Sequence, residues 1–541
     1  MARVKFLPND VTIDVNEQVT ILDAARLAGV RIESPCNGTG KCGKCRVTLD
    51  DGETPVLACT TVVRDGVSVH VVEEDNRSLE ILSHANHVET SVDPYIRKIF
   101  VATEGRTLVY GGAYLLGSEK GDGVDKNYGV VVDIGTTTLV ASLVDLTGGH
   151  ELGTASSLNP QAIHAQDVLS RITFCAEPEG MDIMFGEFAK EVNRLVGEVS
   201  TRAGIDRENI YEAVYSGNTC MLHLATGTNP RSLGRYPYTP ALTGGQVLSA
   251  EEMGLRISKY GLVYLPPVIS GFVGADITSG ILATRLHERK GKTLFVDIGT
   301  NGEMVLSVDG TLVASSTAAG PAFEGMNITF GMRAERGAVE EFSVTERGVS
   351  LKTIGNAAVR GICGSGLLDI VGELVAHRVI DDKGKLVDPA NGIYPFLKDR
   401  LGRENDKPVF YLSPGVYLSQ KDVRQVQLAK GAVRTGIEFL LRHGGITARD
   451  VDEVLIAGSF GYHLREESLI STGLLPAEFR GKVEFVGNTS KSGGHVFLVN
   501  KEAREEITTL VKGINVLELA NYPDFDKVFV KSLGFHQEEW A

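Results

Sequence analysis

Four of the seven cysteines fall within residues 36–59, and their spacing is that of a metal centre. Five residues separate Cys36 from Cys42, two separate Cys42 from Cys45, and thirteen separate Cys45 from Cys59. Plant-type ferredoxins hold a 2Fe–2S cluster with C-x₄-C-x₂-C and a distant fourth cysteine. Here the first gap is one residue longer and the last gap is short. Because one loop can supply three thiolates and a nearby strand the fourth, we predict one 2Fe–2S cluster on these cysteines.

A structural zinc site is the alternative, because Zn²⁺ also takes four thiolates. Such sites usually pair two C-x₂-C segments, and this stretch has one. Gly38, Gly40 and Gly43 favour a loop that wraps closely round a cluster, and their N–H groups can hydrogen-bond its sulfurs. The other cysteines are expected to be buried thiols: Cys175, Cys220 and Cys363.

The sequence Asp-Ile-Gly-Thr occurs twice, at 133–136 and 297–300, each time after an apolar strand-like run and before a second one. A glycine in such a turn lets the backbone approach a phosphate, and turn N–H groups form an anion-binding nest. The aspartates would hold Mg²⁺, which keeps much of its hydration. One copy alone is a commonplace hairpin turn, but two copies indicate paired phosphate sites. The residues predicted to bind phosphates and Mg²⁺ are Asp133, Gly135, Thr136, Thr137, Thr138, Asp297, Gly299, Thr300, Asn301 and Gly302.

Two further glycine-rich turns follow apolar segments. In residues 455–463, LIAGSFGYH, a strand leads into a turn that can seat an adenosine against the backbone, although a plain turn is equally compatible. Residues 319–325, AGPAFEG, carry the same ambiguity. The nucleotide-binding residues expected from these turns are Gly320, Gly458, Ser459 and Phe460.

Single polar residues near these motifs have two interpretations each. Glu303 directly follows the second Asp-Ile-Gly-Thr and can orient an attacking water, as in phosphoryl transfer, or be a solvated strand residue. Asp276 is expected to cap a helix rather than orient a water or a partner, and Asn218 is expected to cap a helix rather than reach the nucleotide. His223 is expected to be a satisfied core residue. The predicted catalytic residues are Asp133, Asp297 and Glu303.

The elements that position these motifs divide into modules. Residues 1–82 show two short strands, a helix over 20–28, the cysteine loop and two more strands, which predicts a β-grasp ferredoxin domain. Residues 83–126 are a predicted linker, with one strand at 97–103 and an exposed loop at 117–127.

From residue 127 onward the chain alternates strand and helix patterns, and the duplicated motif indicates two similar α/β halves. We predict subdomain 1 at 127–290 and subdomain 2 at 291–541; the resemblance described below implies that together they form an actin-like ATPase domain. The multidomain fold is thus α+β followed by α/β. The sequence contains neither G-x-x-x-x-G-K-[ST] nor G-x-G-x-x-G after a strand, which disfavours Walker and dinucleotide folds.

Net charge and the distribution of apolar residues limit the partners and locations to be expected. A net charge of −15 gives no electrostatic reason to bind nucleic acid. No run of about 18 apolar residues exists, so no membrane span is expected. The first residues alternate like a strand and lack the apolar core of a signal peptide, which favours a cytoplasmic location.

Residues 1–80, with PCNGTGKCGKCRVTL and a later ACTT, resemble 2Fe–2S ferredoxins. Residues 128–490 resemble the superfamily of actin, sugar kinases and heat-shock chaperone ATPases, in which two phosphate hairpins clamp a nucleotide. A cluster joined to an ATPase suggests hydrolysis coupled to an uphill electron transfer.

In this combination the chain resembles the reductive activators of corrinoid proteins, which return Co(II) corrinoid to Co(I) for methyl transfer. The motifs that carry the match are PCNGTGKCGKC, VVDIGTTT, FVDIGTNGE, SGFVGAD, AGPAFEG, QLAKGAVRTGI and IAGSFG. The resemblance implies ATP, Mg²⁺, a partner protein that carries the cobalamin, a low-potential electron donor and a homodimer. No cysteine follows Cys363, so one cluster only is expected, although some related activators carry 4Fe–4S clusters near the C-terminus.

Three other functions stay open at the level of sequence. A redox-regulated small-molecule kinase would need a catalytic base, for which Asp276 is the candidate. An ATP-dependent activator of another low-potential metalloenzyme would couple ATP hydrolysis to electron transfer in the same way, but to a different partner. A scaffold that binds ATP and a cluster without turnover would need no catalytic residue.

Overall fold

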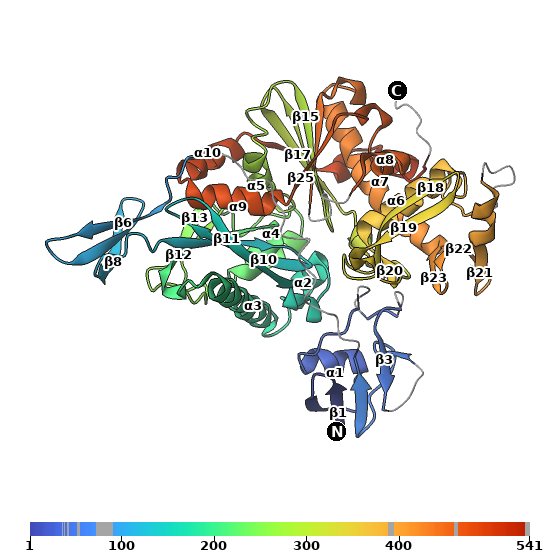
Figure 1. Ribbon diagram of the computed structural model, residues 1–541, viewed down its shortest axis with the longest axis horizontal. Coiled ribbons are helices and arrows are strands. Elements are labelled where there is room, and N and C mark those ends of the chain that lie inside the picture. Colours follow the sequence, from blue (N-terminus) through green and yellow to red (C-terminus); the bar gives the residue numbers. More distant parts are fainter. Residues whose placement is uncertain are drawn as a thin grey trace.

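The computed structural model describes residues 1–34, 36, 38–40, 43–50, 55–71, 90–387, 394–458 and 464–535. Figure 1 shows a small N-terminal domain below two larger α/β bodies, which we call lobe 1 and lobe 2. Lobe 1 is built on the sheet that contains residues 128–134, and lobe 2 on the sheet that contains residues 292–298.

The N-terminal domain is a five-stranded sheet that packs on one helix. The sheet order is β2-β1-β5-β3-β4, with β1 and β5 parallel. Ala2, Val4 and Phe6 are buried while the residues between them are exposed, as a half-covered strand requires. The elements are β1 (Ala2–Leu7), β2 (Val11–Val15), α1 (Ile21–Leu27), β3 (Arg46–Leu49), β4 (Val56–Leu57) and β5 (Val67–His70). The predicted β-grasp fold is confirmed.

A three-stranded antiparallel sheet comes next in the described part of the chain and contacts lobe 1, where the sequence predicted one strand and a loop from residue 117. Its strands are β6 (Ile96–Val101), β7 (Arg106–Gly111) and β8 (Tyr114–Lys120). The charged residues of 117–127 suggested an exposed loop, but one of them, Glu119, has partners in the fold. Glu119 forms an ion pair with buried Lys98 at 3.0 Å and accepts a hydrogen bond from Tyr211 of lobe 1 at 2.7 Å. The prediction was wrong at β8 because a local pattern cannot show a distant counter-charge.

Lobe 1 contains a six-stranded sheet of order β11-β10-β9-β12-β14-β13, covered on one face by the long helix α3. All eight residues of β12 are buried, as expected of a central strand covered on both faces. The strands are β9 (Tyr128–Ile134), β10 (Thr138–Asp145), β11 (Glu151–Leu158), β12 (Ile210–Gly217), β13 (Gln246–Ser249) and β14 (Leu262–Leu265). The helices are α2 (Val168–Phe174), α3 (Gly180–Ala203), α4 (Thr219–Ala225) and α5 (Ala275–Ala283).

Lobe 2 repeats the plan, with the order β25-β24-β15-β16-β17-β26. In both lobes three antiparallel strands follow one another and a later strand pairs in parallel with the first. The strands are β15 (Lys292–Ile298), β16 (Gly302–Val308), β17 (Thr311–Thr317), β24 (Glu453–Ala457), β25 (Val483–Gly487) and β26 (Asn515–Leu517). The helices are α6 (Gly364–Ala376), α7 (Gln420–His443), α8 (Glu466–Ser471) and α11 (Phe525–Ser532). The duplication suggested by the repeated motif is therefore present in the strand pairing.

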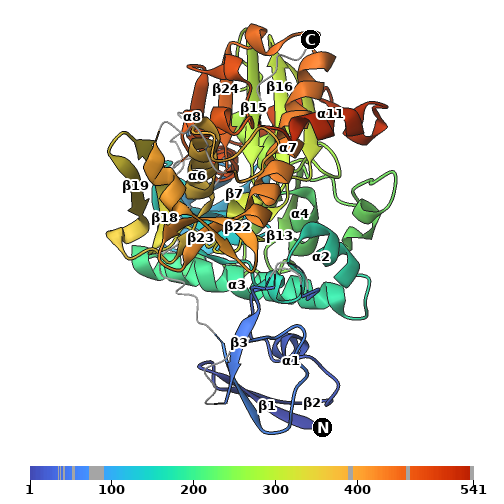
Figure 2. The ribbon, with the colours of Figure 1, turned by 90° about the vertical axis from the view of Figure 1, so that its right-hand side faces the viewer.

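Two small sheets extend lobe 2 (Figure 2). The first contains β18 (Ala338–Thr345), β19 (Gly348–Thr353) and β20 (Gly361–Ile362). The second contains β21 (Leu401–Glu404), β22 (Lys407–Ser413) and β23 (Val416–Ser419).

The last part of the chain returns to lobe 1. The helix α9 (Thr489–Val499) packs on α5 and on the strands β9 and β12, and α10 (Glu502–Val511) follows it. A Cβ on Gly493 would lie 2.0 Å from the carbonyl oxygen of Ser279, so only glycine lets the two helices approach this closely. Lobe 1 thus includes residues far beyond 290, and the predicted domain limits stay a prediction.

A buried ion pair fixes α10 to β12. Arg504 donates to both carboxylate oxygens of Glu212, at 2.8 and 2.9 Å, and both side chains are buried. The guanidinium also lies over the ring of Tyr264, 4.3 Å from its centre. Such a pair costs more to break than it contributes when formed, because removing one partner leaves the other charge buried alone.

Glu212→Gln is therefore expected to lower the free energy of unfolding by about 3 kcal/mol. The exposed ion pair between Arg194 and Glu198 on α3 is the control, and Arg194→Ala should cost about 1 kcal/mol or less. Urea denaturation followed by circular dichroism measures both, and equal midpoints for the two variants would contradict the expectation.

Candidate functional site

A cleft lies where the two repeated turns face each other. Of the residues predicted from sequence, those that line the cleft are Asp133, Gly135, Thr136, Thr137, Thr138, Asp297, Gly299, Thr300, Asn301, Glu303 and Gly458. The structure therefore brings the two motifs and the start of the third turn to one place.

Two predicted residues support the second turn from outside the cleft lining. Gly320 donates its backbone N–H to the carbonyl of Thr300 at 2.8 Å, and its φ of +77° favours glycine. A Cβ on Gly302 would lie 2.9 Å from Val433 of α7, so its small size serves packing. Ser459 and Phe460 lie outside the described residues.

The first turn is held by three side chains of lobe 1. Asn159 donates to the carbonyl of Gly135 at 2.9 Å, and Arg171 donates to the carbonyl of Thr136 at 2.6 Å. Asn218 donates to the Thr136 hydroxyl at 3.2 Å and caps α4 through its oxygen, so the helix-cap prediction is confirmed, while contact with the nucleotide stays a prediction. These bonds fix the turn before any ligand arrives, which lowers the entropic cost of binding.

Arg171 supports the first turn, and the sequence did not reveal this role. It is buried in α2, bonds the Gln161 side chain at 3.1 Å, and burial lowers its pKa to about 10. Nothing in the local sequence SRITF distinguishes it from a surface arginine, because the partners lie on other segments.

Carboxyl groups gather at the floor of the cleft. Burial, with the charges of its neighbours, raises the pKa of Asp276 and of Asp297 to about 7, and it raises the pKa of Glu303 well above the usual range. Burial also raises the pKa of Asp133, although the hydrogen bonds that it accepts from Asn488 and Ser490, both at 2.7 Å, oppose the rise. Acidic oxygens that repel one another in one cleft are the donor set that a hard cation such as Mg²⁺ prefers.

The position of Asp276 differs from the expectation that this residue caps a helix. Gly274 occupies the N-cap position of α5 without a side-chain cap bond, and Asp276 lies in the first turn, where its carboxylate lines the cleft. The helix-cap prediction was wrong because the helix begins two residues earlier than a cap at Asp276 requires, which places Asp276 beside the neighbouring aspartates.

Glu324, at the end of the AGPAFEG segment, joins the two turns. One of its carboxylate oxygens accepts a hydrogen bond from Thr137 and the other accepts one from Thr300. It lines the cleft and is itself buried. A charged residue inside an otherwise apolar, glycine-flanked segment was the only sequence signal for it.

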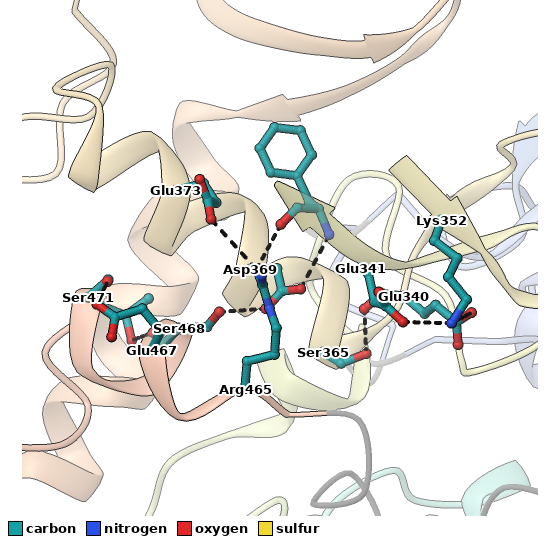
Figure 3. A network of polar contacts seen from close by, with 12 residues as sticks. Glu340, Glu341, Lys352, Ser365, Asp369, Glu373, Arg465, Glu467, Ser468 and Ser471 are labelled. Atoms are coloured by element: carbon teal, nitrogen blue, oxygen red, sulfur yellow. Dashed lines mark hydrogen bonds and ion pairs between the residues drawn. The ribbon is translucent and has the colours of Figure 1, made fainter. Parts of the chain in front are cut away.

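The wall of the cleft in lobe 2 is braced by a polar network round Asp369 of α6 (Figure 3). Asp369 accepts hydrogen bonds from Arg465 at 2.9 Å and from Ser468 at 2.5 Å, and Arg465 also donates to the carbonyl of Phe342. Ser365, near the start of α6, lines the cleft. Because Arg465 follows the predicted adenosine turn, the network connects the segment after that turn to α6, whose first residues line the cleft.

Gly458 is the point where that turn touches the second phosphate turn. Its φ is +114°, and a Cβ there would lie 2.5 Å from the carbonyl oxygen of Ile298. Gly458→Ala is expected to weaken ATP binding at least about tenfold, since it adds both backbone strain and a clash. Gly415→Ala, at φ +80° with open space around it, is the control for strain alone. Calorimetric titration with ATP tests this, and equal affinities would contradict it.

The cysteine loop brings sulfurs together in the N-terminal domain. The sulfurs of Cys45 and Cys59 lie 3.3 Å apart, and both residues are buried. Burial, with Cys45 and Cys36 nearby, raises the pKa of Cys59 to about 11, while the N–H of Gly40 bonds its sulfur. Cys42 lies outside the described residues. Converging thiols with a backbone donor fit an iron–sulfur cluster, which supplies one-electron chemistry when bound.

The remaining thiols and His223 behave as expected. Cys175, Cys220 and Cys363 are buried. His223 is also buried; Nδ1 donates to the carbonyl of Thr219 at 2.7 Å and Nε2 accepts two backbone N–H groups at 3.1 Å. None of these residues needs a ligand to explain its position.

Three family models match successive parts of the chain. Residues 4–64 match the "2Fe-2S iron-sulfur cluster binding domain", 128–289 the "RACo middle region", and 291–541 the "C-terminal domain of RACo the ASKHA domain". Within these limits lie the predicted cluster cysteines and both phosphate turns. The predicted cluster type and ATPase class are confirmed.

Two relatives and one solved structure match most or nearly all of the chain. The "Corrinoid activation enzyme RamQ" of Eubacterium limosum is 30% identical over 98% of this chain and 99% of its own. The "[Co(II) methylated amine-specific corrinoid protein] reductase" of Methanosarcina barkeri is 25% identical over 75% of this chain and 77% of its own. A solved structure titled "Reductive activator for corrinoid,iron-sulfur protein" superposes with a TM-score of 0.74, at 30% identity, over 99% of this chain and 98% of that one. With an N-terminal 2Fe–2S domain, the middle region and the ASKHA domain in order, this chain belongs to the family of reductive activators of corrinoid proteins.

Proposed function

We propose that the protein uses ATP to drive one-electron reduction of a corrinoid protein from Co(II) to Co(I), for use in methyl transfer. The observation that carries this is the presence, in one chain, of converging cluster thiols and a cleft lined by two phosphate turns. Similarity over 98% of the chain to one protein named for corrinoid activation, and over 75% to one named as a corrinoid protein reductase, supports the choice of partner. The cobalamin belongs to the partner, which is the substrate.

ATP is needed if the transfer runs uphill. For one electron, about 59 mV changes the equilibrium constant tenfold, so a deficit of a few hundred millivolts would stall the reaction. A nucleotide can shift the balance between two arrangements of the lobes only by binding one arrangement more tightly than the other. That difference in binding free energy would have to offset the unfavourable potential. In this proposal the clamp formed by Thr137 and Thr300 senses the phosphates, and its closure gates electron delivery.

The roles of individual residues follow from the cleft. Asp133 and Asp297 would hold Mg²⁺ through water, because their carboxylates lie beside the phosphate turns. Glu303 would orient the attacking water, and Gly458, Ser459 and Phe460 would lie near the adenosine. The protein would act as a homodimer and receive electrons from a separate low-potential donor.

No helix in the described part of the chain is both long and apolar enough to span a membrane. We further propose that the protein works in the cytoplasm, next to the corrinoid protein that it serves.

The test mixes reduced protein, Co(II) corrinoid protein and Mg·ATP under anaerobic conditions and follows Co(I) absorbance. Co(I) should form with ATP and not with buffer alone. Equal formation without nucleotide would reject the coupling. Transfer of phosphate to a small acceptor, in a substrate screen, would favour the kinase alternative instead.

A further inference from the structure

The carboxyl group of Asp133 is held by two side chains from one much later segment. Asn488 donates its side-chain amide to one carboxylate oxygen at 2.7 Å, and the Ser490 hydroxyl donates to the other, also at 2.7 Å. Both donors are only 6% exposed, so the bonds are shielded from competing water. The Ser490 hydroxyl also lies 2.9 Å from that of Ser216, but an anionic carboxylate is the stronger acceptor. One donor on each oxygen fixes both the position and the rotation of the carboxyl group.

These bonds leave acceptor capacity on Asp133 for the cleft. An ionised carboxylate has about four lone-pair sites on its two oxygens. Asn488 and Ser490 use one site on each oxygen, and Asp133 itself lines the cleft beside the first phosphate turn. The remaining sites can accept hydrogen bonds from the water molecules that a bound Mg²⁺ keeps.

The segment that carries the two donors is itself firmly placed. Asn488 is the N-cap of α9, where its side-chain oxygen accepts the N–H of Lys491 at 2.9 Å. The preceding residue, Gly487, ends β25 of lobe 2, and its carbonyl accepts the N–H of Gly458 at 3.2 Å. On its other side α9 packs on α5 and on the strands of lobe 1 (Figure 1). The donors therefore form a fixed support to which Asp133 is held.

A purely structural role is the alternative for these two bonds. They would then only compensate the cost of burying the Asp133 carboxylate, and their loss would lower stability. Neither Asn488 nor Ser490 lines the cleft. A structural role therefore predicts that any loss of nucleotide affinity is the same with and without Mg²⁺.

We propose that Asn488 and Ser490 are positioning residues for Mg²⁺-dependent nucleotide binding, and that they act through the carboxylate of Asp133. The proposal rests on the ATP-driven function above, because it takes Asp133 as a residue that holds Mg²⁺ through water. In metal sites, removal of a group that hydrogen-bonds a metal-holding side chain typically costs about 10–100-fold in metal affinity. The two substitutions should therefore weaken the contribution of Mg²⁺ and leave contacts with the nucleotide itself unchanged.

The test measures the affinity of full-length, cluster-loaded protein for a non-hydrolysable ATP analogue by titration calorimetry, once with Mg²⁺ and once with EDTA. The wild type should bind more tightly with Mg²⁺. Ser490→Ala should weaken binding with Mg²⁺ at least about tenfold and binding with EDTA by less than about twofold. Asn488→Ser keeps a residue that can cap α9 but is too short to reach Asp133, so it should behave in the same way.

Ser492→Ala is the matched control. Ser492 is similarly buried in the same helix, and its hydroxyl donates to the carbonyl of Asn488 at 3.2 Å rather than to Asp133. This variant should keep the wild-type affinities under both conditions. Ser490→Thr retains a hydroxyl and should recover part of the affinity that Ser490→Ala loses with Mg²⁺. Thermal unfolding without nucleotide checks that each variant is folded.

Three results would overturn the proposal. The first is an equal loss of affinity with and without Mg²⁺ in Ser490→Ala and Asn488→Ser, and the second is wild-type affinity in both. The third is the same loss in Ser492→Ala, which would assign the effect to the packing of α9. A wild type that binds the analogue more tightly with Mg²⁺, but forms no Co(I) with ATP, would reject the proposed function and leave the positioning role intact.

Discussion

Asp297→Asn is expected to lower ATP turnover by at least about a hundredfold and to abolish the ATP-dependent part of Co(I) formation. The carboxylate lies beside the second phosphate turn, where Mg²⁺ would need its charge. The amide keeps the shape and loses that charge. Steady-state phosphate release and Co(I) absorbance measure the two losses, while the visible spectrum of the cluster should not change.

The same substitution should stabilise the nucleotide-free protein, with a defined pH dependence. An ordinary aspartate loses its proton near pH 4, whereas burial and the charges of Asp276 and Asp133 raise the pKa of Asp297 to about 7. Between these values the folded state holds a proton that the unfolded chain has lost, so stability falls as the pH rises through that window. The apparent Tm of Asp297→Asn should exceed that of the wild type by at least about 2 °C at pH 8 and by little at pH 4.

The control for both effects is Asp526→Asn, an exposed position in the first turn of α11. It should leave turnover and stability unchanged. If Asp297→Asn hydrolysed ATP at the wild-type rate, Asp297 would not be a metal-holding residue. If its Tm at pH 8 were lower than that of the wild type, the proposed repulsion among the cleft carboxylates would be contradicted.

Cys45→Ser is expected to abolish the cluster and with it all electron delivery to the corrinoid protein. The sulfur of Cys45 lies 3.3 Å from that of Cys59, and iron in such clusters is bound by thiolates, which a serine hydroxyl replaces poorly. Iron content and visible absorbance after anaerobic reconstitution should fall to background. ATP hydrolysis without partner should stay within about twofold of the wild type, because the cleft is formed by other domains.

Cys175→Ser is the matched control, since Cys175 is buried in lobe 1, away from the cluster loop. It should retain the cluster. Full iron loading of Cys45→Ser would exclude Cys45 as a ligand, and loss of iron in Cys175→Ser would show that the assay reports misfolding.

Both candidate sites could be located from sequence because their residues are close together in the chain. Cys36, Cys42 and Cys45 fall within ten consecutive residues, and each repeated Asp-Ile-Gly-Thr turn is a single hairpin between two adjacent strands. A short loop brings its own residues together whatever surrounds it. For the same reason the β-grasp order of elements could be predicted, whereas β8 was missed because its partner Lys98 belongs to another strand.

The sequence by itself determined the kinds of chemistry in this protein: thiolate ligands at cluster spacing, and two glycine turns with an aspartate at each. Only the tertiary structure decided how these parts meet. Glu324 reaches Thr137 across 187 positions of the chain, and Lys44 reaches Gly331 across 287. Contacts of this kind depend on how the lobes and the N-terminal domain pack against one another, and no local pattern of residue types encodes that packing.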